Sequence, residues 1–209
     1  LNEKKVTPAT TMDEAPVQIG EYTIRTWNDQ YHGSITMSQV LEYSSNVGMV
    51  FVEKKIGKEK MLDYIRAFGF GQPTGIDLED ESSPAIRSEK DWKDIDLATA
   101  SFGQGIAVTP LQMVRAVGVL ANGGWLMEPH VVKEIRDQRG RVIRIAPKRV
   151  RQVIDASSAS VITEMMIAAV DRGEARWAKP AGYRIAGKTG TAQIPVAGHY
   201  DDKKTIASF

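Results

Sequence analysis

The sequence predicts an α+β fold in which helices pack on an antiparallel sheet. Two patterns along its 209 residues point to this fold class. Segments with apolar residues at helical spacing outnumber strand-like segments. The strand-like segments gather in the second half of the chain, where a turn sequence at 137–140 joins two of them, as in an antiparallel hairpin.

The N-terminal part is expected to be a loop with one short strand, at 22–25, followed by a helix. The helix begins after Thr36, because Thr36 and Gln39 can form a capping box in which each side chain binds a backbone N–H of the other residue. Apolar residues follow at helical spacing. The helix is predicted to end near 44–46, since Ser and Asn side chains compete for backbone hydrogen bonds.

Four further helices follow from apolar spacing and from their end signals. Glycine follows two of them, as is typical of a helix C-terminus, and Thr109-Pro110 supplies the cap and the first residue of another. The stretch 69–108 is rich in Gly, Ser and Asp, and we expect a long functional or mobile connection there. The predicted helices cover 47–55, 58–68, 109–121 and 155–170.

Strands are predicted on both sides of the 137–140 turn, within 125–145. The end of the chain also has strand-like alternation. Its predicted strands are 183–186 and 191–194, with 204–209 as a candidate antiparallel partner and a polar loop at 195–202. The chain stops within a strand-like segment and begins without a signal peptide. We therefore expect both ends to be cuts through a longer protein.

Composition excludes several classes of protein. Lys plus Arg number 27 and Asp plus Glu 26, a balance that argues against nucleic-acid binding, which needs a cationic surplus. The absence of cysteine rules out disulfide scaffolds, thiolate zinc sites and cysteine nucleophiles. The histidines, His32 among them, lack the spacing of metal ligands and are expected on loops or the surface. No apolar run approaches the roughly 18 residues of a membrane span.

Residues 182–189 fit the phosphate-loop pattern G-x-x-x-x-G-K-[ST] letter for letter. That mechanism needs a helix directly after the loop. Here Gly190, Pro195 and β-branched residues follow instead, and the loop itself contains a strand-like segment. A nucleotide-binding protein is therefore an alternative that the local pattern disfavours.

The same lysine belongs to Lys188-Thr189-Gly190, a triplet of penicillin-reactive serine enzymes. Its ammonium offers positive charge to an anionic substrate, threonine hydroxyls such as that of Thr191 can bind a carboxylate, and the glycine lets a peptide backbone lie close. Taken alone, the triplet fits a solvated lysine beside a turn equally well.

The second motif is Ser44-Ser45-Asn46, which fits the S-x-N pattern of the same enzymes. Its hydroxyl can relay a proton and its amide can hold a substrate. Taken alone, it fits capping residues between two helices. The order of the two motifs along the chain, S-x-N before K-T-G, is the order that serine transpeptidases use.

Longer stretches around these motifs carry a wider resemblance. Along nearly its whole length, the chain resembles the transpeptidase domain of class B penicillin-binding proteins. The stretches that carry the resemblance are 41–48, 102–106 with 108–112, 121–124 and 186–193.

The resemblance implies the fold of penicillin-binding proteins and serine β-lactamases, with an antiparallel sheet packed by helices and an all-helical subdomain. It implies a partial transpeptidase domain, mainly helical with S-x-N over 1–124, and with a hairpin, a helix and the K-T-G strand over 125–209. It also implies catalytic and substrate-binding roles but no metal and no cofactor. The catalytic residues would be Ser44, Asn46 and Lys188, and the substrate-binding residues Thr189, Gly190 and Thr191.

One departure concerns the nucleophile. The family uses an S-x-x-K motif, whose serine attacks the substrate and whose lysine is its base. No serine in this chain is followed by lysine three residues later. The motif is expected just before residue 1, so this chain on its own is expected not to form an acyl-enzyme.

The implied activity is peptidoglycan D,D-transpeptidation, an acyl transfer from D-Ala–D-Ala stem peptides that β-lactams inhibit. The implied partners are stem peptides, β-lactam antibiotics and other cell-wall synthesis proteins, without nucleic acid. Membrane contact would come only through a segment outside this chain, anchoring the parent protein at the extracytoplasmic, periplasmic face of the bacterial membrane. The alternatives are an inactive or β-lactam-sensing module of the same fold, or a β-lactamase.

Overall fold

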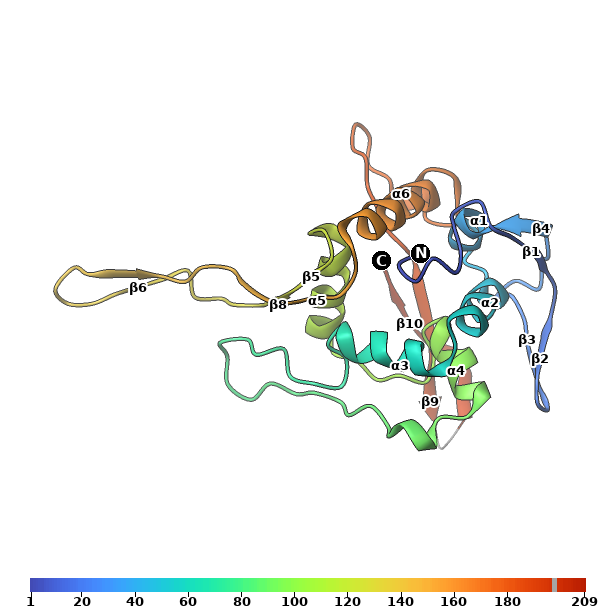
Figure 1. Cartoon of the computed structure of the whole chain (residues 1–209), viewed down its shortest axis with the longest axis horizontal. Coiled ribbons are helices and arrows are strands. Elements are labelled where there is room, and N and C mark those ends of the chain that lie inside the picture. The colour runs from blue at the N-terminus through green and yellow to red at the C-terminus, as the bar shows by residue number, and fades with distance from the viewer. Residues whose placement is uncertain (197–198) are drawn as a thin grey trace. The chain divides into compact units, whose positions relative to one another are not determined.

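In the part of the chain that the structure describes, the strands form five separate two-stranded ladders, and every pair runs antiparallel. These pairings come from a computed structural model that describes residues 1–196 and 199–209. Helices and antiparallel strands together make an α+β fold (Figure 1), which confirms the predicted class. The chain divides into two compact units, each assembled from separated stretches of sequence.

The first unit contains Leu1–Met61, Ser88–Ile106 and Val161–Phe209. Two of its ladders lie near the N-terminus and the third near the C-terminus. Among its described residues, one cluster of apolar side chains lies around Ile35 and Val40 and another around Val47 and Val50. Its elements are β1 (Thr11–Glu14), β2 (Val17–Ile19), β3 (Tyr22–Ile24), β4 (Gly33–Thr36), α1 (Met37–Glu42), α2 (Asn46–Ile56), α4 (Asp94–Ser101), β9 (Gly190–Val196) and β10 (His199–Ser208), with most of α6 (Ala156–Arg172).

The second unit contains Leu62–Arg87 and Ala107–Ser160. Val119 and Leu126 are fully buried at the centre of its core, with Ile154 and Ala159 beside them. Its elements are most of α3 (Lys58–Ala67), α5 (Pro110–Ala121), β5 (Trp125–Glu128), β6 (Glu134–Arg136), β7 (Val142–Arg144) and β8 (Lys148–Gln152).

Capping explains where two of the helices begin, as predicted. At the start of α1, the Gln39 N–H donates to the Thr36 hydroxyl, and the Thr36 N–H donates to the Gln39 side chain. Thr109 and Gln112 repeat this box at the start of α5. These reciprocal bonds satisfy N–H groups that the first helical turn leaves without partners.

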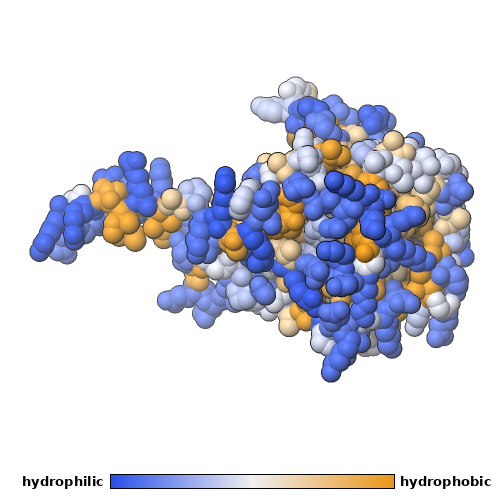
Figure 2. Space-filling model, in the orientation of Figure 1, coloured by the Kyte–Doolittle hydropathy of each residue, from blue (hydrophilic) through white to orange (hydrophobic). Residues whose placement is uncertain are grey.

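The β6–β7 hairpin forms where the turn sequence predicted it, and the turn is closed by the carboxylate of Asp137. That carboxylate accepts the backbone N–H groups of Arg139 and Arg141. Ile135 pairs with Ile143 across the ladder, and both side chains are exposed. Figure 2 shows the hairpin as hydrophilic residues around a small apolar cluster.

Several predicted boundaries are wrong. Residues 183–186 are not a strand, because regular pairing begins only at Gly190. The predicted loop at 195–202 is strand at 195–196 and 199–202, and 197–198 lie outside the described residues. The predictions also lacked α4, β8 and the ladders at 11–14 and 17–19. The predicted division of the domain into a mainly helical part, 1–124, and a part with the hairpin, the helix and the K-T-G strand, 125–209, stays a prediction.

None of the helices in the described ranges has the length and hydropathy needed to cross a membrane.

Candidate functional site

Ser44 lies at the junction of α1 and α2 in an unusual backbone conformation. The N–H of Ser45 donates to the carbonyl of Val40 over 2.9 Å, and the N–H of Ser44 donates to that of Leu41 over 3.3 Å. This is the Schellman pattern that ends many helices, and its left-handed position normally holds glycine. Ser44 occupies that position with a φ of +55°. A strained non-glycine residue of this kind is a marker of functional sites.

The side chain of Lys188 is in direct contact with that of Ser44. Its ammonium donates to the Ser44 hydroxyl over 2.7 Å, and to the carbonyl and hydroxyl oxygens of Thr189 over 3.1 and 3.2 Å. A lysine ammonium has three donors, so each N–H has an oxygen partner. All three oxygens are neutral, which leaves the positive charge available to an anionic group.

The surroundings of Lys188 act on its acidity in two directions. Burial lowers the pKa of its ammonium below the ordinary value, and the negative charge of Glu174 partly offsets that shift. A lysine with a lowered pKa gives up its proton more readily, which suits proton exchange with the adjacent hydroxyl. A perturbed titratable group that contacts a strained serine is the chemical signature of a candidate active site.

The other predicted site residues lie around this contact in different ways. Thr189 binds Lys188, as described, and Gly190 begins β9 opposite Ser208. Thr191 is the next residue of β9 and is exposed. Asn46 is the first residue of α2, two positions from Ser44, and its amide donates to the backbone carbonyl of Arg25 over 3.1 Å.

The phosphate-loop alternative fails on the element that follows it. Gly182 stands in a turn, residues 183–189 have no regular structure, and β9 begins at Gly190. A phosphate loop needs a helix N-terminus at this position. Because a strand stands there, the nucleotide-binding interpretation of residues 182–189 is excluded.

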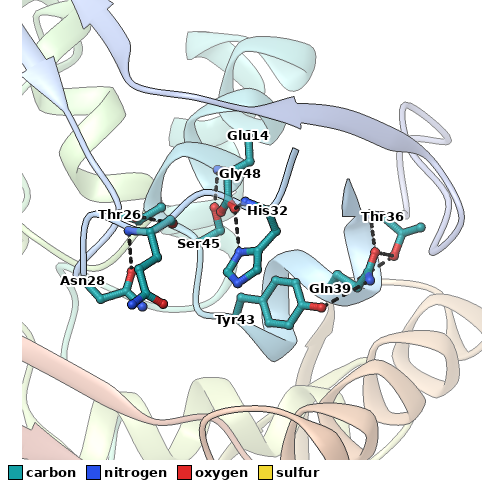
Figure 3. A network of polar contacts seen from close by, with 10 residues as sticks. Glu14, Thr26, Asn28, His32, Thr36, Gln39, Tyr43, Ser45 and Gly48 are labelled. Carbon is teal, nitrogen blue, oxygen red and sulfur yellow. Dashed lines mark hydrogen bonds and ion pairs between the residues drawn. The ribbon is translucent and has the colours of Figure 1, made fainter. Parts of the chain in front are cut away.

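Sequence reasoning missed a polar network that includes Tyr43 and Ser45, the two chain neighbours of Ser44 (Figure 3). Glu14 is 4% exposed and accepts both the backbone N–H and the ring Nδ1 of His32, each over 3.0 Å. The ring of His32 stacks on Tyr43 with 4.3 Å between centroids. Ser45 lowers the pKa of the Glu14 carboxyl, and its own hydroxyl accepts the N–H of Gly48 over 3.1 Å. The only sequence signal was the Thr36 cap, which fixes where the helix before Tyr43 begins.

A second missed feature holds the end of α1 against the end of α6. Arg172 forms a 2.7 Å ion pair with Glu42, whose side chain is buried, and the N–H of Glu174 donates to the Glu42 carbonyl over 3.0 Å. A Cβ at Gly173 would overlap that carbonyl oxygen. The glycine therefore permits the close approach that brings Glu174 within electrostatic reach of Lys188.

An open cavity of about 600 Å³ adjoins this junction. It combines aromatic faces with both signs of charge, which suits a polar, partly apolar ligand. It is lined by His32, Tyr43, Arg172, Gly173, Glu174, Arg176 and Trp177.

Among the side chains that the structure describes, at 1–194 and 204–209, no group of three or more His, Asp or Glu is placed to hold a metal ion.

Comparison with known proteins agrees with this geometry. The chain is 37% identical over 199 residues to stage V sporulation protein D of Bacillus subtilis, covering 94% of this chain and 31% of that protein. It is 31% identical over 183 residues to peptidoglycan D,D-transpeptidase MrdA of Acinetobacter baumannii, covering 83% of this chain and 27% of that protein. The chain thus spans less than a third of the length of these relatives.

Among solved structures, penicillin-binding protein 3 of Mycobacterium tuberculosis in complex with ampicillin matches with a TM-score of 0.91 and 29% identity. The match covers 99% of this chain and 48% of that one. The family model for the penicillin-binding protein transpeptidase domain matches residues 1–209. The strained serine, the lysine that meets it and the surrounding fold therefore have a common explanation: the chain belongs to the penicillin-binding protein transpeptidase domain family.

Proposed function

We propose that the full-length protein is a serine-type D,D-transpeptidase of peptidoglycan synthesis, and that this chain supplies two walls of its acyl-transfer site. The S-x-N junction forms one wall and the segment that leads into β9 forms the other. The observation that carries the proposal is the 2.7 Å hydrogen bond from Lys188 to Ser44. It places a positive charge and a relay hydroxyl side by side, where an acyl-transfer reaction can use both.

The proposed reaction has two halves. A serine hydroxyl attacks the carbonyl between the two terminal D-Ala residues, its proton passes to the departing amine, and D-Ala leaves. An amine of a second stem peptide then attacks the acyl-enzyme, and the serine regains its proton. Ser44 would relay these protons. Lys188 would bind the substrate carboxylate and stabilise the negative charge that develops in the transition state. The hydroxyls of Thr189 and Thr191 would act with it.

The attacking serine is assigned to a part of the protein outside these 209 residues. No serine within them has the lysine partner three positions later that would activate it. Ser44 itself contacts a lysine, but its proposed role is to relay protons to and from that outside serine. On this proposal, the chain alone forms no acyl-enzyme with penicillin.

The proposed substrates are stem peptides that end in D-Ala–D-Ala, and β-lactams are the proposed inhibitors. Two findings support this substrate class. The A. baumannii relative is named a peptidoglycan D,D-transpeptidase, and the M. tuberculosis relative holds ampicillin in its structure. Since peptidoglycan lies outside the cytoplasmic membrane, the proposed location is its extracytoplasmic face, with an anchor in the parent protein and other wall-synthesis proteins as partners.

Covalent labelling with a fluorescent penicillin tests the proposal. The wild-type full-length protein is expected to be labelled and Lys188→Ala is expected to lose labelling while its thermal unfolding stays cooperative. Lys179→Ala is the matched control, because Lys179 pairs with Asp171 instead of contacting Ser44. A wild-type protein that takes no label would contradict transpeptidation and would favour an inactive module of the same fold. Normal labelling of Lys188→Ala would contradict the role of the lysine.

A further inference from the structure

We propose that Glu14 is a positioning residue that holds Ser44 in the geometry needed for proton relay. This inference rests on the proposed function, because it concerns how the relay hydroxyl is placed. Glu14 lies outside both motifs, and the hydrogen bonds that the structure shows for its carboxylate go to His32 rather than to Lys188. It acts through Tyr43 and Ser45, the residues on either side of Ser44.

The β1–β4 ladder brings Glu14 to this position. Glu14 ends β1 and pairs with Gly33 at the start of β4. That register puts the preceding residue, His32, beside the Glu14 carboxylate, where its backbone N–H and its ring both bind the same oxygen. Figure 3 shows the carboxylate between His32 and Ser45, with Tyr43 next to the histidine ring.

Two arms lead from this carboxylate to the neighbours of Ser44. One leads to Ser45, a residue that is 1% exposed, lowers the pKa of the Glu14 carboxyl and caps α2 by accepting the N–H of Gly48. Through His32, the carboxylate fixes a ring that stacks on Tyr43 at an interplanar angle of 24°. Ser44 therefore lies between Tyr43, which stacks on the histidine that Glu14 binds, and Ser45, which interacts with the Glu14 carboxyl.

The need for such support follows from the conformation of Ser44. A left-handed φ costs an L-residue roughly 1–2 kcal/mol, and a strained residue persists only where its surroundings over-determine it. Burial of a carboxylate is itself unfavourable unless the charge is well bonded. Burial raises the pKa of Glu14, but the bonds from Ser45 and His32 outweigh that effect and keep the pKa below its ordinary value. The carboxylate is therefore ionised and firmly bonded at neutral pH.

The test measures penicillin acylation of the full-length protein in two parts, the dissociation constant of the first complex and the rate constant of the covalent step. Glu14→Ala is expected to lower the covalent rate constant about a hundredfold, the effect of an active-site displacement of about 1 Å, and to leave the dissociation constant within about threefold. Glu14→Gln keeps oxygen and nitrogen partners for Ser45 and His32, so it is expected to recover most of the rate.

Glu53→Ala is the matched control. Glu53 is another buried glutamate of the same unit, on α2, and burial raises its pKa. It is expected to acylate like the wild-type protein. A Glu14→Ala variant that unfolds at lower temperature yet acylates at the normal rate would overturn the inference, since the role of Glu14 would then be structural only.

If Glu14→Ala does not fold, His32→Phe tests the inference instead, because it keeps an aromatic ring beside Tyr43 and removes the ring nitrogen that binds Glu14. A normal covalent rate in His32→Phe would overturn the inference.

Crystal structures of the variants separate this inference from the proposed function. If wild-type protein takes no label, the transpeptidase proposal fails, and the positioning role is then judged from geometry alone. In Glu14→Ala or His32→Phe, Ser44 is expected to leave its left-handed φ and Lys188 Nζ to move beyond hydrogen-bond distance of Ser44 Oγ. An unchanged contact in both variants would overturn the inference.

Discussion

The ammonium of Lys188 donates a 2.7 Å hydrogen bond to the hydroxyl of Ser44, although the two residues lie 144 positions apart. Each partner has an unusual state of its own. Ser44 has a left-handed backbone, and burial lowers the pKa of Lys188. Each of these two states costs the protein folding stability. Because two such costly groups are in direct contact, they indicate a functional site more strongly than either group would alone.

Substitution of Ser44 separates backbone strain from hydroxyl chemistry. Ser44→Gly and Ser44→Ala both remove the hydroxyl that meets Lys188, so both are expected to slow penicillin acylation of the full-length protein. Only glycine adopts a left-handed φ without steric cost, so Ser44→Gly is expected to be about 1 kcal/mol more stable than Ser44→Ala. Chemical denaturation measures the difference. Equal stabilities would show that the φ of +55° carries no strain.

The acidity of Lys188 is open to direct measurement. Competitive acetylation across a pH series, with quantification of the modified lysine by mass spectrometry, is expected to give Lys188 a midpoint below its ordinary pKa of 10.5. Glu174→Gln is expected to lower that midpoint further, because the carboxylate of Glu174 favours the charged ammonium. A midpoint that rises in Glu174→Gln would contradict the electrostatic link between the two residues.

Two glycine-to-alanine substitutions are expected to have opposite effects on stability. At Gly173 the new methyl group overlaps the carbonyl oxygen of Glu42, so Gly173→Ala is expected to cost about 1–3 kcal/mol, as overpacking does. At Gly118, inside α5, the methyl group meets nothing within 4 Å, so Gly118→Ala is expected to stabilise the protein by about 0.5–1 kcal/mol. Urea denaturation of each variant against wild type gives the sign. A neutral Gly173→Ala would show that the end of α6 can move away from α1.

Local signals in the sequence predicted much of the fold. The Thr36 and Thr109 caps marked the starts of α1 and α5, because a capping box depends on residues only three positions apart. Helix α4 was missed for a related reason. It has eight residues, and only Leu97 and Ala98 are buried, so its apolar spacing is too short to distinguish from a loop.

The candidate site was predicted in part. The motifs around Ser44 and Lys188 are short patterns with chemical meaning, and the structure brings those two residues into contact. Glu14 and His32 could not be found in this way. Their contact depends on the register of the β1–β4 ladder, and register is set by non-local pairing that a single sequence does not display.

Glu14 and Glu53 are both buried, and their contributions to the free energy of unfolding are expected to respond to pH in opposite directions. The pKa of Glu14 is below its ordinary value of 4.5, so its ionised form stabilises the fold at neutral pH, and that contribution is lost as the pH falls from about 4.5 through the lowered pKa. Burial raises the pKa of Glu53, so its ionised form destabilises the fold, and protonation removes that penalty as the pH falls through the raised pKa toward 4.5. Relative to Glu14→Gln, the wild-type protein should therefore lose free energy of unfolding on acidification, and relative to Glu53→Gln it should gain. Denaturation of the three proteins at a series of pH values between about 7 and 3 measures both trends, and two trends of the same sign would contradict the assignment of one of the two carboxyl groups.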